Sequence, residues 1–118
     1  MLHTFKKPIP VRKGWVIDNI GYIPLTKGLV ATVSPHWVPF LEKWNWFAKL
    51  NARSGDHYAG RLESRKLNPG VRGRYVHMAR VILGMSLDDK EHVPDHINRN
   101  KLDYRVENLR VITPTENL

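Results

Sequence analysis

Apolar and polar residues alternate in several short segments of this chain. Alternation with a period of two predicts half-buried strands, and it occurs at residues 22–25, 29–33, 45–50, 58–63 and 74–78. Between the second and third segments, four apolar residues recur at helical spacing: Trp37, Phe40, Leu41 and Trp44. Ser34-Pro35 precedes them, and we expect Ser34 to be the N-cap of a short helix. A second helix is expected at residues 79–85.

The last third of the chain has a different pattern. Residues 93–96 predict a strand, a loop rich in Asn, Arg and Asp follows, and residues 109–112 predict a second strand. Thr113-Pro114, with Glu116 three residues after Thr113, is typical of a helix start with a capping box. The order is therefore strand, loop, strand, helix. Asp95-His96 stands in the first strand and Asn117 in the first turn of the expected helix.

Composition narrows the classes of function. The chain has 118 residues, no cysteine, and 19 Lys+Arg against 11 Asp+Glu, a net charge of +8. The lack of cysteine excludes disulfides, thiolate zinc sites, iron–sulfur clusters and cysteine nucleophiles. No stretch approaches the roughly 20 apolar residues of a membrane span, and the N-terminal segment has no apolar run of a signal peptide. We therefore expect no membrane partner, a cytoplasmic protein, and four tryptophans that belong to the core.

Basic residues gather in one strip, residues 61–80, where Glu63 is the one acidic residue. Arginine forks match phosphate in two-point contacts, so the strip favours a phosphate backbone as partner. A solvated hairpin with a basic tip explains the same residues equally well. The expected contacts of this strip are Arg61, Arg65, Lys66, Arg72, Arg74 and Arg80.

The C-terminal segment resembles the ββα-metal finger of HNH endonucleases, in the form found in phage and homing-type enzymes. The elements that carry the resemblance are, in order, Asp95-His96-Ile97-Asn98-Arg99-Asn100, Leu102-Asp103-Tyr104-Arg105, Asn108-Leu109-Arg110, Thr113 and Asn117. The similarity extends over residues 21–117. It implies an α+β fold in which a small antiparallel β unit with a short helix precedes an HNH ββα-metal module.

The resemblance also implies roles for individual residues. His96 would be the general base, because imidazole is neutral yet basic near neutral pH. Asp95 and Asn117 would hold one divalent cation, Mg²⁺ or Mn²⁺, through hard oxygen ligands. Asn108 would orient His96 or the loop by hydrogen bonding. His77 would contact phosphate, and three further basic residues would contact DNA: Arg99, Arg105 and Arg110.

Two local features bear on this site. Asp95 and His96 are neighbours, and neighbours on a regular strand face opposite sides, so both reach one site only where the strand ends or bends. Arg99 stands where glycine is frequent in the family, which argues against a left-handed turn at that position. The remaining histidines have no zinc-ligand spacing, so we expect no structural zinc.

We therefore expect an N-terminal arm at residues 1–20, a β-rich region at 21–72 and the nuclease module at 73–118. The expected function is a metal-dependent endonuclease that nicks double-stranded DNA, as a monomer or weak dimer, in a bacterial or phage-infected cell. Three alternatives stay open: a non-catalytic nucleic-acid-binding module of the same fold, an interaction protein whose acidic loop binds a partner, and an enzyme that cleaves RNA.

Overall fold

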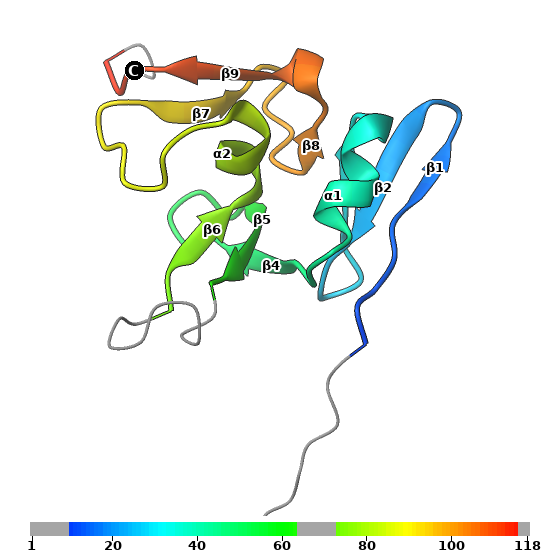
Figure 1. Ribbon diagram of the computed structural model, residues 1–118. Coiled ribbons are helices and arrows are strands. Elements are labelled where there is room, and N and C mark those ends of the chain that lie inside the picture. The colour runs from blue at the N-terminus through cyan, green and yellow to red at the C-terminus, as the bar shows by residue number, and fades with distance from the viewer. Residues whose placement is uncertain (1–9, 64–72, 116–118) are drawn as a thin grey trace, which may run out of the picture.

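The computed structural model describes residues 10–63 and 73–115, and it shows a mixed α+β fold made mostly of strands (Figure 1). Three small sheets account for the strands. Their orders are β1-β2-β3-β8, β4-β5-β6 and β7-β9. The α+β class expected from the sequence is confirmed.

The four-stranded sheet combines three strands from the first third of the chain with one strand from the last third. Its strands are β1 (Trp15–Ile17), β2 (Ile20–Pro24), β3 (Val30–Val33) and β8 (Asp103–Tyr104). The first three are antiparallel, whereas β8 pairs parallel to β3 with Thr32 opposite Asp103. Alternate residues of β2 and β3 are buried, as the period of two predicts. Backbone pairing therefore ties the loop between β7 and β9 to the N-terminal strands.

The segment after β3 forms only short helices, the 3₁₀ helix η1 (Pro35–Trp37) and α1 (Val38–Leu41). Ser34 is the N-cap residue and Pro35 stands in the first turn, as expected, but the Ser34 side chain makes no capping hydrogen bond. The Ser34 hydroxyl instead accepts a hydrogen bond from the backbone N–H of Val106 at 2.9 Å. A partner distant in sequence thus occupies the oxygen that a local cap would use.

The three-stranded antiparallel sheet has one face in the core and one face outside it. Its strands are β4 (Phe47–Leu50), β5 (His57–Leu62) and β6 (Tyr75–His77). Ala48, Ala59 and Val76 are buried on the core face. The register places a second set of side chains on the outer face: Phe47, Lys49, Tyr58, Tyr75 and His77.

Helix α2 (Met78–Leu83) follows β6 directly and contacts both β5-β6 and the two-stranded sheet (Figure 1). That sheet consists of β7 (Val93–His96) and β9 (Leu109–Ile112), which are antiparallel, and the 3₁₀ helix η2 (Val106–Asn108) precedes β9. Met78, Ala79 and Ile82 are the buried residues of α2. The helix therefore fixes the two-stranded sheet beside the three-stranded one.

The tryptophans divide between core and surface. Trp46 is fully buried, and its indole N–H donates to the Leu41 carbonyl at 2.8 Å. Trp15 is 41% exposed, so its expected place in the core is wrong. It lies on the edge strand β1 and stacks on Tyr22, with 5.6 Å between the ring centroids.

The chain beyond β9 turns at Pro114 and Thr115. The remainder of the helix expected there, with Asn117, lies outside the described residues. No helix in the described ranges is long and apolar enough to cross a membrane.

Candidate active site

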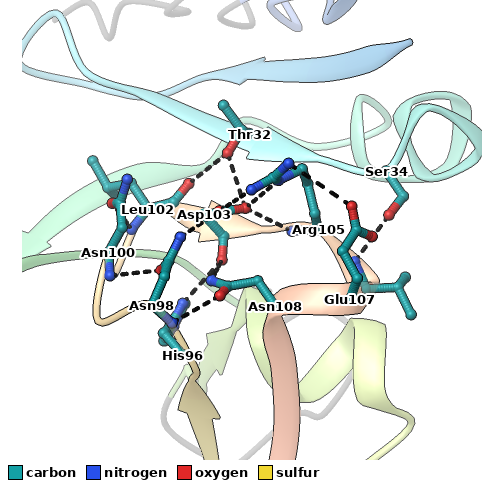
Figure 2. Close-up of polar contacts among 11 residues, drawn as sticks. Thr32, Ser34, His96, Asn98, Asn100, Leu102, Asp103, Arg105, Glu107 and Asn108 are labelled. Carbon is teal, nitrogen blue, oxygen red and sulfur yellow. Dashed lines mark hydrogen bonds and ion pairs between the residues drawn. The ribbon is translucent and has the colours of Figure 1, made fainter.

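His96 is the last residue of β7, and its ring is held by one backbone group. The imidazole Nδ1 lies 3.0 Å from the carbonyl oxygen of Asp103 (Figure 2). A carbonyl oxygen only accepts hydrogen bonds, so Nδ1 carries the proton. The second ring nitrogen, Nε2, then keeps its lone pair. This is the tautomer that a general base needs.

Aromatic rings surround His96, which is 4% exposed. The ring centroid of Tyr104 lies 4.9 Å from that of His96, and the ring centroid of Tyr58 lies 6.3 Å from it. Both pairs are T-shaped. Burial lowers the pKa of His96 below its ordinary value, although the hydrogen bond to Asp103 acts in the opposite direction. Burial therefore favours the neutral form of the ring, which lines a cavity of about 380 Å³.

Asn108, expected to orient His96 or the loop, reaches His96 through a shared acceptor. Its Nδ2 donates to the same Asp103 carbonyl at 2.9 Å, and its Oδ1 accepts from the backbone N–H of Asn98 at 2.9 Å (Figure 2). The Asn108 carbonyl also accepts from the Ile97 N–H at 2.8 Å. Asn108 thus connects the start of the loop to the carbonyl that fixes His96.

Side chains of the loop fold it back on its own backbone. The Oδ1 atoms of Asn98 and Asn100 accept from the N–H groups of Asn100 and Leu102, at 2.9 and 3.1 Å. Arg99 between them has a φ of 66°, so the expectation that it avoids a left-handed turn is wrong. Its N–H donates to the His96 carbonyl at 2.9 Å, and this closed turn holds the conformation.

Asp103 and Arg105 form a two-point ion pair beside this loop, with Nε–Oδ1 and Nη2–Oδ2 distances of 2.8 and 2.7 Å. Burial by itself raises the pKa of Asp103, but hydrogen bonds from Arg105 and Asn98 overcome it and lower the pKa to about 2. Arg105, expected to contact DNA, therefore pairs with the Asp103 carboxylate, which also accepts a hydrogen bond from Asn98 of the loop.

Asp95, the expected metal ligand of β7, does not share the surroundings of His96. Its Oδ2 accepts from Arg110 Nε across the β7-β9 pair at 2.8 Å. His96 lines the cavity, whereas Asp95 is not among the lining residues. This separation agrees with the alternation of neighbours on a strand.

The donor chemistry suits a hard divalent cation, because Asp95 offers carboxylate oxygen and the expected second ligand, Asn117, offers amide oxygen. Asn117 itself lies outside the described residues. Within residues 10–63 and 73–115, no three His, Cys, Asp or Glu side chains are grouped to hold a metal ion.

The described residues of the basic strip do not share one surface. Arg61 lies over the ring of Trp44 at 4.3 Å, on the core side of its sheet. Arg74 forms ion pairs with Glu63 and Asp88, at 3.1 and 3.4 Å. Three expected contacts lie outside the described residues: Arg65, Lys66 and Arg72.

Two expected contacts do lie at the cavity, Arg80 and His77. Arg80 donates to the carbonyls of Ser86 and His92, at 2.8 and 3.3 Å, and this fixes its guanidinium. Burial lowers the pKa of His77, and the charges of Arg80 and Lys49 lower it further. Of the other expected DNA contacts, Arg99 and Arg110 are exposed.

The cavity also contains residues that motif-based reasoning missed. Lys49, Tyr58 and Tyr75 line it from the outer face of the β4-β5-β6 sheet. Alternation at residues 45–50 indicates which side chains share a face with Lys49. Nothing in the local sequence indicates that this face lies next to β7. The place of Lys49 at the cavity therefore follows only from the three-dimensional structure.

Comparison with protein families gives one match, between residues 76–118 and the family model described as HNH endonuclease. Neither the comparison with curated proteins nor the comparison with solved structures found a match. The matched segment includes α2, β7 and β9, and several residues that line the cavity lie in it, among them His77, Arg80 and His96. Residues 76–118 are therefore the part of the chain that is similar to HNH endonucleases.

Proposed function

We propose that this protein is a divalent-metal-dependent HNH endonuclease that hydrolyses phosphodiester bonds in double-stranded DNA and nicks one strand by default. It acts as a monomer or weak dimer in the cytoplasm of a bacterial or phage-infected cell. The observation that carries the proposal is the hydrogen bond from His96 Nδ1 to Asp103, 3.0 Å long. It leaves Nε2 as the basic nitrogen of a buried imidazole beside a cavity with cationic walls.

In the proposed reaction, Nε2 of His96 takes a proton from the water that attacks phosphorus. A new O–P bond forms and the bond from phosphorus to the 3′ oxygen breaks. The leaving 3′ oxygen takes a proton from solvent water, so the products carry a 5′ phosphate and a 3′ hydroxyl. The Asp103 carbonyl and Asn108 keep the ring in place while its charge changes. Arg80 and Lys49 add positive charge to a cavity whose lining, over residues 10–63 and 73–115, includes no Asp or Glu.

Asp95 and Asn117 would hold the single divalent cation, Mg²⁺ or Mn²⁺. When bound, such an ion neutralises negative charge on the phosphoryl and leaving oxygens. Arg110 holds the Asp95 carboxylate through Oδ2 in the structure. Asp95→Asn should therefore remove nicking while it leaves His96 in its place.

The proposal is tested by incubating supercoiled plasmid with the protein and Mg²⁺ or Mn²⁺, with and without a chelator. We expect relaxed circles that require the metal. His36→Ala is the matched control, because His36 is exposed on η1, away from the cavity. Equal nicking by His96→Ala and His36→Ala, or no metal-dependent nicking at all, contradicts the proposal.

A second candidate, a non-catalytic nucleic-acid-binding module, is favoured by one observation. The Asp95 carboxylate is already engaged by Arg110 at 2.8 Å, an ion pair that needs no metal. This candidate predicts salt-dependent DNA binding without strand cleavage. The plasmid assay separates the two, because binding alone leaves the supercoiled form intact.

A further inference from the structure

We propose that the outer face of the β4-β5-β6 sheet is the second wall of the catalytic groove, where Lys49 binds a substrate phosphate adjacent to the scissile one. The inference rests on the proposed function and extends it to residues outside the HNH family match. It assigns a phosphodiester subsite to β4, a strand in which no DNA contact was expected.

The sheet register carries the first step. Lys49 pairs with Tyr58, and Gly60 pairs with His77, so these side-chain positions lie on the same face. Lys49, Tyr58 and His77 line the cavity together with His96. His96 comes from β7, which belongs to another sheet. The cavity is therefore a groove between two sheets, with the proposed base on one wall and Lys49 on the other.

Lys49 is held in place without losing its charge. Its Nζ lies over the ring of Tyr75, 4.4 Å from the centroid. A ring face attracts an ammonium group but carries no net charge that would neutralise it. Within the part of the chain that the structure describes, no carboxylate forms an ion pair with Lys49. The ammonium is therefore available to an anionic ligand.

Tyr75 is itself fixed by its neighbours. Its ring lies 5.9 Å from Phe47 and 4.4 Å from His77, between centroids. A methyl group on Gly60 would overlap the Tyr75 hydroxyl, so glycine at that position lets the ring lie across β5. Because one face of Tyr75 carries Lys49 and His77 packs against the ring, the site favours phosphate over a stacked base.

The groove as a whole favours an anion. Among the residues that the structure describes, none that lines the groove is Asp or Glu, whereas Lys49 and Arg80 are both positively charged. Burial lowers the pKa of His77, and the charges of Arg80 and Lys49 on the same groove lower it further. A phosphodiester carries one negative charge and several acceptor oxygens, and a strand whose scissile phosphate lies at His96 brings a second phosphate close by.

The test measures DNA binding with the full chain in chelator, so that no cleavage occurs. Binding of a fluorescein-labelled DNA duplex is followed by anisotropy over a series of salt concentrations. Each phosphate contact contributes about 0.9 to the slope of log K against log salt. We expect Lys49→Gln to reduce the slope by about one, and Lys49→Arg to keep the slope of the unmodified protein.

Lys43→Gln is the matched control. The Lys43 ammonium also lies over an aromatic ring, 5.2 Å from the centroid of Phe40, but it does not line the groove. Its slope should equal that of the unmodified protein. Circular dichroism confirms that each variant is folded before binding is compared.

The outcomes separate this inference from the proposed function. If the protein nicks plasmid but Lys49→Gln keeps the full slope, the subsite is wrong and the endonuclease stands. If Lys49→Gln loses one contact but the protein does not nick, the subsite stands and the endonuclease is wrong. A protein without salt-dependent DNA binding overturns the subsite.

Discussion

The hydroxyl of Tyr104 accepts a hydrogen bond from the backbone N–H of Ala59 at 2.8 Å. This contact joins residues 76–118, the segment that matches the family model, to strand β5. Tyr104 is 1% exposed, and burial raises the pKa of its hydroxyl. The same ring packs edge-on against His96. One buried side chain thus links the proposed base to the sheet that forms the opposite wall of the groove.

Tyr104→Phe should lower the free energy of unfolding by about 1–3 kcal/mol, because the buried Ala59 N–H loses its partner. Urea unfolding measures the change. Tyr22→Phe is the control, since Tyr22 is half-buried and stacks on the exposed Trp15. Equal losses in the two variants would show that the Tyr104–Ala59 hydrogen bond contributes nothing specific.

Asn108→Ala removes two hydrogen bonds at once, one to the Asp103 carbonyl and one from the Asn98 N–H. The free energy of unfolding should fall by about 2 kcal/mol, since each of the two lost bonds contributes about 1 kcal/mol. Nicking should fall as well, because the carbonyl that orients His96 is no longer held.

Asn51→Ala is the comparison for this variant. The Asn51 side chain accepts from the N–H groups of Arg53 and Ser54, but it does so in an exposed turn. Its loss of stability should stay below about 1 kcal/mol. A stable, fully active Asn108→Ala variant would show that Asn108 is not needed to orient His96.

The ion pair of Asp103 and Arg105 makes stability depend on pH. The pKa of Asp103 is lowered from 3.8 to about 2 in the folded protein. A lowered carboxyl pKa stabilises the fold above pH 4, and this stabilisation is lost as the pH falls from about 4 to 2. Asp103→Asn should therefore cost about 2 kcal/mol at pH 7 and progressively less below pH 4. Urea midpoints at several pH values test this, and a cost that is independent of pH would refute it.

Strands that lie next to each other in sequence could be predicted, because alternation and turn residues are local signals. The expected strands 93–96 and 109–112 coincide with β7 and β9, and the other five expected strands agree with β2 to β6 within a few residues. Strand β1 was not predicted, because it has only three residues and all of them are exposed. The parallel pairing of β8 with β3 could not be predicted from alternation or turn residues, because β8 has only two residues and its partner lies far away in sequence. The same long-range contact draws the Ser34 hydroxyl to Val106.

The sequence motif identifies side chains of the candidate site, but it does not predict how they are positioned relative to one another. The motif singles out Asp95, His96 and Asn108, but the group that fixes His96 is a backbone carbonyl, which side-chain patterns do not reveal. Lys49 reaches the cavity through sheet packing. Charge along the chain likewise did not indicate that Arg61 lies on Trp44.

The proposed role of His96 is tested most directly by the rate at which His96→Ala nicks plasmid, with and without added imidazole. General-base catalysis contributes about 10²–10⁴-fold, so the rate should fall by at least about a hundredfold and rise again with imidazole. His36→Ala should match the unmodified protein with or without imidazole. Nicking by His96→Ala within a few-fold of the unmodified rate would contradict the account.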